Sequence, residues 1–308
     1  MMKAVFIVGP TASGKTSVSI ELAKHFGGEI ISADSMQIYK GIHIASAAPD
    51  ESEKQGIPHH LIEFLDLCDQ FSVADYVKLA REKIAEISSR GKLPIIVGGT
   101  GLYISSLIDN VEFIEQDADL ELRSRLEQKF DTLGGDGMLL ELRDFDPDSA
   151  NRLHPNNRRR IIRAFEVYLQ TGKTITEQNI ISKQNKGEIE PLILGLNFTD
   201  RQKLYDRINL RVDLMLQNGL LSEAESTYQK RNNKGAFQAI GHKELYPYFD
   251  GELSLEDATE NLKMQTRRYA KRQLTWFKKV PNVNWFYPDS QNVLEDIFNL
   301  TNKFLKEE

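Results

Sequence analysis

Residues 9–16 read GPTASGKT, between an apolar run at residues 3–8 (KAVFIV) and a helix-like segment at residues 17–25. The stretch matches the phosphate-binding pattern GxxxxGK[ST] at every fixed position. A buried strand, a glycine-rich turn and a helix start, in this order, direct backbone N–H groups and the positive end of the helix dipole at one anion. The stretch therefore predicts a polyphosphate site, with Lys15 on phosphate oxygens and the Thr16 hydroxyl on Mg²⁺. The alternative is a glycine-rich turn without a ligand.

Composition bounds what the chain can be. At 308 residues it exceeds one typical domain, so we expect a main domain with a smaller insertion. The net charge of −6 argues against a protein that coats nucleic acid generally.

No apolar run approaches membrane-spanning length, and the chain enters a strand without a signal peptide, which predicts a cytoplasmic protein with no membrane partner. We further expect a monomer. Cys68 is the only cysteine, which excludes a disulfide within one chain, and we expect it to be buried.

Further apolar runs at residues 29–33, 61–65, 94–97 and 191–198 predict more strands of the same sheet. Ligands of open parallel sheets bind off the carboxyl ends of the strands. Asp34 follows the second strand, which places its carboxylate beside the phosphate loop as a base, as a Mg²⁺ ligand or as the cap of a turn. The strand at 94–97 runs into GGTG, where Thr100 could donate its hydroxyl to a phosphate; a tight turn is the alternative.

A change of pattern marks an insertion. From about residue 111 to residue 186 the sequence is helical, so we expect a core of residues 1–110 and 187–308 and an inserted domain of residues 111–186. Its first part is acidic, and a later helix carries an apolar face opposite a basic one. That basic face is either a solvated surface or a lid for nucleotide or nucleic acid. The acidic residues include Glu112, Glu115 and Asp117; the apolar face has Ile161, Ile162, Phe165 and Leu169, and the basic face has Arg158, Arg159 and Arg163.

Basic residues also gather in two helices of the second half. Arg207 and Arg211 lie one helical turn apart and could clamp a diphosphate or form ion pairs with neighbouring aspartates. Residues 263–279 carry many basic residues and no acidic one, interleaved with aromatic residues. This pattern suits a nucleic-acid backbone and its bases. We nonetheless expect Trp276 and Phe277 to be core residues.

Several motifs occur together in one order along most of the chain. Besides GPTASGKT they are ISADSMQIYKG (31–41), PHHLIE (58–63), FSVADY (71–76), IIVGGTGLYI (95–104), RLHPNNRRRIIRAFEVY (152–168), TGK (171–173), AIGHKEL (239–245) and RRYAKRQLTWF (267–277). In this combination, which is far more specific than any single motif, the chain resembles the tRNA dimethylallyltransferase family, also called tRNA isopentenyltransferases.

The resemblance implies a P-loop α/β fold: a parallel sheet flanked by helices, with a smaller all-helical insertion that binds tRNA. It implies that the loop holds the diphosphate of dimethylallyl diphosphate rather than ATP, and that the acceptor is N6 of the adenosine immediately 3′ of the anticodon. The family's base falls on Asp34, and its phosphate ligands fall on Lys15, Thr16 and Thr100. Its tRNA-contacting segments fall on Asp34, Ser35, Met36, Gln37, Asn157, Arg158, Arg159, Arg160, Ile161, Ala239, Ile240, Gly241, His242 and Lys243.

The reaction explains why these residue types are needed. An exocyclic adenine amine is a poor nucleophile, so we expect Asp34 to accept the N6 proton while C1 of the allyl group is attacked, with Lys15 and Thr100 completing the catalytic set. Gln37 could pair with the adenine edge once the base has left its stack. The departing diphosphate needs cations and hydrogen-bond donors. We expect it to be held by Gly9, Thr11, Ala12, Ser13, Gly14, Lys15, Thr16, Arg207 and Arg211, with Mg²⁺ on Thr16, and the tRNA anticodon stem-loop to be gripped also by Arg267, Arg268, Lys271 and Arg272.

Two departures from the family's pattern bear on this site. Residues 44–49 read IASAAP where members commonly read IGTAKP. Ala45, Ser46 and Ala48 thus stand where glycine, threonine and lysine are usual, which removes a cation near the substrate crevice. His242 stands where a tyrosine is usual.

Three rival interpretations stay open. A P-loop kinase of a nucleotide or small molecule would use residues 158–160 as a lid and would phosphorylate its substrate without tRNA. An adenylate dimethylallyltransferase would use the same chemistry on free nucleotide and would not need the basic insertion. A non-catalytic RNA-binding protein is the third, against which intact Lys15, Thr16 and Asp34 weigh.

Overall fold

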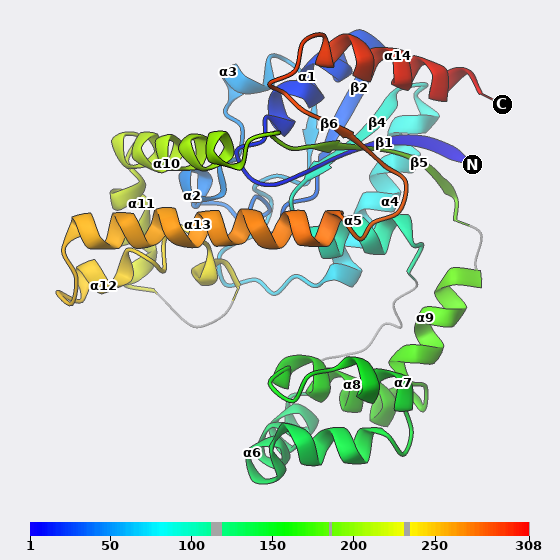
Figure 1. Cartoon of the computed structure of the whole chain (residues 1–308), viewed down its shortest axis with the longest axis vertical. Helices are drawn as coiled ribbons and strands as arrows, with labels where there is room; N and C mark the ends of the chain where they lie inside the picture. The colour runs from blue at the N-terminus through cyan, green and yellow to red at the C-terminus, as the bar shows by residue number, and fades with distance from the viewer. Residues whose placement is uncertain (112–118, 185–186, 231–234, 308) are drawn as a thin grey trace. The chain divides into compact units, whose positions relative to one another are not determined.

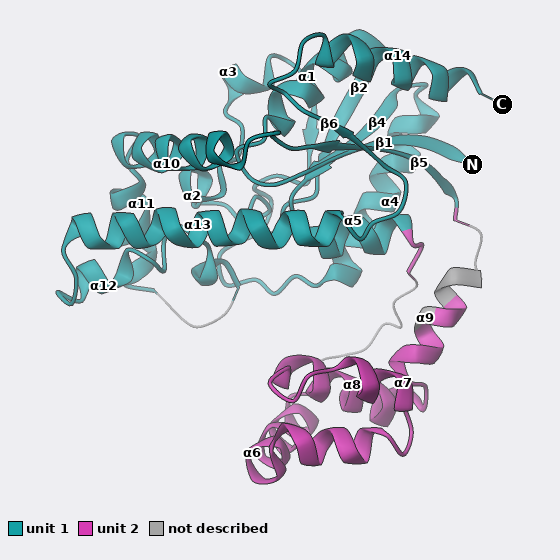
Figure 2. Ribbon diagram, viewed as in Figure 1, with its two compact units in different colours: residues 1–108, 188–308 teal, residues 109–187 magenta. Residues whose placement is uncertain are grey.

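The computed structural model describes residues 1–111, 119–184, 187–230 and 235–307 (Figure 1). They form two compact units, one of Met1–Ile108 with Glu188–Glu308 and one of Asp109–Gly187 (Figure 2). The second unit thus interrupts the sequence of the first. Glu112, Glu115 and Asp117 of the expected acidic stretch lie outside the described residues.

In the described residues of the first unit, six strands form one parallel sheet in the order β3, β2, β4, β1, β5, β6. β1 lies between two neighbours, with Val5 opposite both Ile95 and Leu192. Central parallel strands are buried on both faces and need a continuous apolar sequence. The predicted parallel α/β sheet is therefore confirmed. The strands are β1 Met2–Val8, β2 Gly28–Ser32, β3 His59–His60, β4 Leu93–Gly98, β5 Ile189–Leu196 and β6 Val283–Phe286.

The strand expected at residues 61–65 is wrong, because β3 ends at His60. Leu61 and Glu63 have φ angles of 59° and 49°, which an extended strand does not allow. The segment is a loop whose backbone donates from Leu65 to the carbonyl of Ile38. An apolar run alone does not distinguish a strand from a packed loop. Cys68, also expected to be buried, is exposed.

Helices cover both faces of the sheet. The β1–α1–β2 and β3–α4–β4 connections run in opposite directions along the sheet, and right-handed crossovers then place α1 and α4 on opposite faces. α14 packs on the same face as α1, through a core that includes Leu22, Leu194 and Ile297. The helices of this unit are α1 Lys15–Phe26, α2 His43–Ser46, α3 Glu51–Lys54, α4 Val73–Ser89, α5 Gly101–Ile108, α10 Arg201–Gln217, α11 Leu220–Tyr228, α12 Tyr246–Phe249, α13 Leu255–Phe277 and α14 Val293–Lys306, with a 3₁₀ turn at Gly235–Gln238.

The described residues of the second unit are helical, as predicted. Its core joins Leu122, Met138, Ile161 and Phe165 from the two longest helices. Leu169, expected on the apolar face of its helix, is instead exposed. The helices are α6 Leu120–Leu142, with a break at Gly134, α7 Pro147–Arg152, α8 Arg158–Thr171 and α9 Ile175–Gln184. Across the described ranges of the whole chain, none of the helices combines the length and the apolar character that a bilayer crossing needs.

Candidate active site

A crevice of about 750 Å³ opens in the first unit beyond the carboxyl ends of β1, β2 and β4. Its walls come from the phosphate loop, the segment after β2, α10, residues 238–243 and α13. The predicted base and the predicted phosphate-binding residues, except Gly9 and Thr100, therefore line one cavity. The polar side chains that line it include Lys15, Thr16, Asp34, Gln37, Arg207, Arg211, Lys243, Tyr269 and Arg272.

The phosphate loop has the backbone that its glycines predict. Gly9 and Gly14 have φ angles of 148° and 91°, in the range that favours glycine. A Cβ at Gly9 would lie 2.3 Å from the carbonyl oxygen of Leu196, so no larger residue fits there. α1 starts directly after Gly14, so its free N–H groups point to the space above the loop. In the described residues the buried Ser13 hydroxyl has no hydrogen-bond partner. The free N–H groups of α1 and the Ser13 hydroxyl thus give the loop hydrogen-bond donors that an anion could use.

The charge state of Lys15 is poised by its surroundings. Its Nζ donates to the carbonyls of Gly9 and Pro10, at 3.1 and 2.7 Å. Burial and, to a smaller extent, the positive charge of Arg211 lower the pKa of Lys15, and the carboxylate of Asp34 opposes them; the net result is a pKa of about 7. A bound anion would favour the charged form of this lysine.

Two arginines of α10 reach the same loop. Arg207 donates from Nε to the carbonyl of Ala12 at 3.0 Å, and Arg211 donates to the Thr11 hydroxyl at 3.4 Å. Burial lowers the pKa of Arg211, while Asp34 raises it. Among the described residues, the expected ion pairs with neighbouring aspartates do not form, because Asp206 accepts the Gln202 amide at 2.8 Å and Asp213 pairs with Lys263 at 2.9 Å. The clamp on a diphosphate stays a prediction.

Asp34 lies directly beyond β2, half-buried on the crevice wall. Burial raises the pKa of Asp34, and the backbone N–H of Met36, which donates to its Oδ1 at 2.9 Å, and the charge of Lys15 hold that rise in check. A carboxylate with a raised pKa accepts a proton more readily, which suits a general base. The Met36 contact also forms a local turn, so the capping and base interpretations of Asp34 are compatible.

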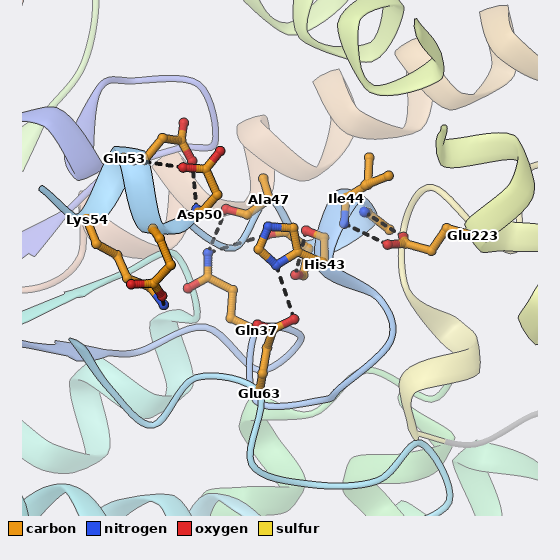
Figure 3. A network of polar contacts seen from close by, with 12 residues as sticks. Gln37, His43, Ile44, Ala47, Asp50, Glu53, Lys54, Glu63 and Glu223 are labelled. Carbon is orange, nitrogen blue, oxygen red and sulfur yellow. Dashed lines mark hydrogen bonds and ion pairs between the residues drawn. The ribbon is translucent and has the colours of Figure 1, made fainter. Parts of the chain in front are cut away.

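Thr100 and Gln37 are engaged within the protein. Thr100 accepts the N–H of Ser35 at 2.9 Å and so lies behind the Asp34 segment rather than on the crevice wall. Gln37 lines the crevice, but its amide oxygen accepts a hydrogen bond from the Ser32 hydroxyl at 2.8 Å. Its amide nitrogen donates to the carbonyl of Ala47 at 3.0 Å (Figure 3). A base edge would have to exchange with one of these bonds.

The AIGHKEL segment divides between the crevice and the core. Ala239, Ile240, Gly241 and Lys243 line the crevice, whereas the side chain of His242 is fully buried. His242 therefore supports the wall and does not present its side chain to a ligand.

The carboxylate of Glu223 on α11 connects His242 with α2. It contacts His242 Nε2 at 2.8 Å. It also accepts hydrogen bonds from the N–H groups of Ile44 and Ala45, at 2.7 and 2.9 Å; Glu223 and Ile44 are labelled in Figure 3. The two departures from the family's pattern, at Ala45 and at His242, thus meet at one carboxylate. Ala45 and Ser46 line the crevice, and Ala48 is buried.

The basic residues of α13 differ in their availability. Arg267 donates to the side chain of Asn209, while Arg268, Lys271 and Arg272 are exposed. Arg272 also lies over the ring of Tyr269, with 5.7 Å from its guanidinium carbon to the ring centroid. Phe277 is fully buried as predicted, but Trp276 is partly exposed.

The predicted tRNA contacts of the second unit lie around the start of α8. Asn157 is the residue before the helix, and Arg159 and Arg160 are exposed. Arg158 forms an ion pair with Asp131 on α6. Ile161 is fully buried in the core of the unit, so its side chain supports the helix and is not presented to a ligand.

One residue of the site was missed at the sequence level. Gln273 of α13 receives the N–H of Thr11 at 2.8 Å and donates to the carbonyl of Gly99 at 3.0 Å. Its position inside a run of basic residues gives no sign of this role. The GGTG turn is therefore held by a hydrogen bond from α13, in addition to any contact with a ligand.

The residues present are compatible with Mg²⁺. No group of three or more histidine, cysteine or carboxylate side chains gathers for a metal in the described ranges. Mg²⁺ at a phosphate site needs no such group, because it takes one or two protein oxygens and fills its shell with phosphate oxygens and water. Thr16, exposed in the first turn of α1 and lining the crevice, supplies one such oxygen.

Comparison with known proteins points to one family. A family model described as IPP transferase matches residues 37–280. The chain is 47% identical to a tRNA dimethylallyltransferase of Thermoanaerobacter sp. (strain X514), over 99% of this chain and 98% of that protein. It is 50% identical to a tRNA dimethylallyltransferase of Bacillus subtilis (strain 168), over 92% of this chain and 90% of that protein.

Solved structures agree with these sequence matches. A tRNA isopentenylpyrophosphate transferase from Bacillus halodurans is 42% identical, with a TM-score of 0.74, over 99% of this chain and 97% of that chain. A eukaryotic dimethylallyltransferase described as acting on tRNA is 30% identical, with a TM-score of 0.85, over 100% of this chain and 82% of that chain.

Proposed function

The chain belongs to the IPP transferase family, and we propose that it transfers the dimethylallyl group of dimethylallyl diphosphate to N6 of the adenosine immediately 3′ of the anticodon in tRNA. Diphosphate is the second product. The observation that carries the proposal is that the phosphate loop and the Asp34 carboxylate line one crevice. The proposal includes a cytoplasmic location and a monomer.

The donor is held by the loop. The N–H groups that open α1, the Ser13 hydroxyl and Lys15 surround the position of a diphosphate, and Arg207 and Arg211 close over it from α10. Arginine and lysine placed where charge develops lower the barrier to departure of the leaving group. When bound at Thr16, Mg²⁺ neutralises part of the negative charge of the diphosphate.

The acceptor is deprotonated by Asp34. The N6 lone pair forms the bond to C1 of the dimethylallyl group, the electron pair of the C1–O bond leaves with the diphosphate, and the N6 proton passes to the Asp34 carboxylate. Burial raises the pKa of Asp34, which supports this role. The cations of the donor side keep the carboxylate ionised until then.

The base reaches the crevice only after it leaves its stack. Unstacking costs a few kcal/mol and is cheapest in a single-stranded loop such as the anticodon loop. Lys243 and Gln37 line the crevice, and the exposed Arg268, Lys271 and Arg272 offer cations to the RNA backbone. Thr100 acts through Ser35 and so holds the Asp34 segment in place.

The test is a transfer assay. The protein is incubated with dimethylallyl diphosphate and unmodified tRNA, and the digested tRNA is analysed by mass spectrometry with and without Mg²⁺. We expect one prenylated adenosine, adjacent to the anticodon, that depends on added Mg²⁺. Prenylation of free AMP instead of tRNA, or no prenylation at all, would contradict the proposal. Phosphorylation from ATP without tRNA would favour the kinase interpretation.

A further inference from the structure

A single buried amide joins two sides of the crevice. Gln273 of α13 is 5% exposed. Its Oε1 accepts the N–H of Thr11 in the phosphate loop at 2.8 Å, and its Nε2 donates to the carbonyl of Gly99 in the turn after β4 at 3.0 Å. These partners lie in separate strand–helix connections of the sheet. One side chain from a third element therefore connects them.

The turn after β4 is shaped to receive this amide. A Cβ at Gly99 would lie 2.0 Å from Nε2 of Gln273, and a Cβ at Gly101 would lie 2.5 Å from the Trp276 ring. Both glycines have ordinary φ angles, so it is this close approach of α13 that requires them. The glycines of the turn thus make room for side chains of α13, in addition to any part they take in ligand binding.

A second contact extends the connection to the base. Tyr269 lies one helical turn before Gln273; burial raises the pKa of its phenol, and the nearby side chains of Thr100 and Gln273 partly offset that rise. Thr100 in turn accepts the N–H of Ser35 at 2.9 Å, next to Asp34. The polar groups that follow β4 thus reach both sides: Gly99 is joined through Gln273 to Thr11 on the donor side, and Thr100 is joined to Ser35 on the acceptor side.

The other contacts of Thr11 show why this connection matters. Its N–H is bound by Gln273 of α13, and its hydroxyl is bound by Arg211 of α10. The phosphate loop is thus held between two helices at one residue. Loss of either contact frees the loop to shift relative to the Asp34 segment.

We propose that Gln273 is a positioning residue for prenyl transfer, which sets the separation between the diphosphate loop and the Asp34 segment by joining Thr11 to Gly99. This inference rests on the proposed function, since that separation is what aligns N6 with C1. Reacting atoms must lie about 3–3.5 Å apart and in line, and a misplacement of about 1 Å can lower the rate about 100-fold. Gln273 itself touches no reacting atom in this scheme.

The test compares two glutamine-to-methionine variants. Gln273→Met removes both bonds at nearly constant volume. Gln265→Met makes the same change two turns earlier on α13, where the amide forms a side-chain hydrogen bond only with Asn261 among the described residues. We measure the single-turnover rate with both substrates saturating, the Kd for tRNA, and the melting temperature. We expect a rate about 30- to 100-fold lower for Gln273→Met with tRNA affinity within about 3-fold of wild type, and no change for Gln265→Met.

A third variant separates positioning from mere packing. The protonated carboxyl of Gln273→Glu can make both bonds, accepting from Thr11 and donating to Gly99, whereas the carboxylate cannot donate. The ratio of its single-turnover rate to that of wild type should therefore rise as the pH falls from 9 to 6, while the ratio for Gln273→Met stays flat. This variant also carries the test if the methionine variant fails to fold.

The outcomes are distinct. Hydrogen exchange of the peptide that spans residues 9–14 should be faster in Gln273→Met than in wild type, because the Thr11 N–H has lost its acceptor. A wild-type rate for Gln273→Met, or a flat pH ratio for Gln273→Glu, overturns the positioning role. Failure of the wild-type protein itself to prenylate tRNA would refute the proposed function, while the exchange result would still report on the contact.

Discussion

Lys15 and Asp34 face one crevice, and each changes the charge state of the other. Burial drives both toward their neutral forms, lowering the pKa of Lys15 and raising that of Asp34, and their mutual attraction opposes this. A bound anion would replace Asp34 as the main ionic partner of Lys15. The Asp34 carboxylate would then be available to accept the proton of the acceptor amine. The two residues therefore have to be tested separately.

The first prediction concerns Asp34 as the base. Replacing Asp34 with alanine removes the acceptor of the N6 proton, so we expect turnover to fall about 10²- to 10⁴-fold, the range that general-base catalysis supplies. Binding of tRNA should stay nearly intact, because many other contacts hold the RNA. Single-turnover rates and a tRNA binding titration measure the two quantities. Near-normal turnover would remove Asp34 from this role.

The second prediction concerns the protonation of Lys15. With a pKa of about 7, Lys15 is mostly neutral at pH 8 in the free protein. The donor diphosphate favours the charged form and raises this pKa, so binding at pH 8 should take up a proton. Calorimetry in buffers of different ionisation enthalpy measures that uptake. Lys15→Arg is the control, because arginine stays charged and should show none; equal uptake by both proteins would disprove the assignment.

At the scale of elements, α2 is a single turn held from outside. Its first N–H groups bind Glu223 of α11, and the carbonyl of Ala47 at its end receives Gln37 (Figure 3). His43 contacts Glu63 at 3.1 Å on another side. A helix of this length has little stability of its own. This part of the crevice wall therefore depends on side chains from distant parts of the sequence.

The third prediction follows from this dependence. Glu223→Ala leaves buried His242 and two backbone N–H groups without their carboxylate, so we expect the free energy of unfolding to fall by about 3 kcal/mol, as when one partner of a buried pair is removed. Urea denaturation measures the change. Glu225→Ala is the matched control, because Glu225 lies two residues later on α11 at an exposed position. It should change the free energy of unfolding by no more than about 0.5 kcal/mol. Equal effects of the two variants would refute the anchoring role of Glu223.

At the scale of the whole molecule, the chain consists of a sheet-based unit with the crevice and a helical unit with exposed arginines. The fourth prediction assigns the second unit to tRNA binding. Arg159→Ala with Arg160→Ala should weaken tRNA binding and reduce the slope of log K against log salt concentration by about 1 per lost phosphate contact. Donor binding should not change. Arg123→Ala, in which the lost arginine pairs with Glu127 and Glu166 of the same unit, is the control. An unchanged salt slope would exclude both arginines as phosphate contacts.

Much of the fold could be predicted because its signals are local. The phosphate loop is a contiguous motif. The strands β1, β2, β4 and β5 are contiguous apolar runs, because each is buried on both faces of the sheet. The loop at 61–65 was misjudged because its apolar residues pack without extending. The motifs predict ligand contacts for His242, Ile161 and Thr100, but the first two side chains are buried and Thr100 binds Ser35. Gln273 was missed because its partners lie 174 and 262 residues away in the sequence.

In the proposed reaction, one crevice seats the donor diphosphate on the phosphate loop and presents the acceptor amine to Asp34. The most direct measurement is a crystal structure of the protein with Mg²⁺, an unreactive sulfur analogue of dimethylallyl diphosphate and an unmodified anticodon stem-loop. We expect diphosphate oxygens at Lys15 and the start of α1, and the adenine N6 within hydrogen-bond distance of the Asp34 carboxylate. A phosphate loop left empty, or an adenine held away from Asp34, would contradict it.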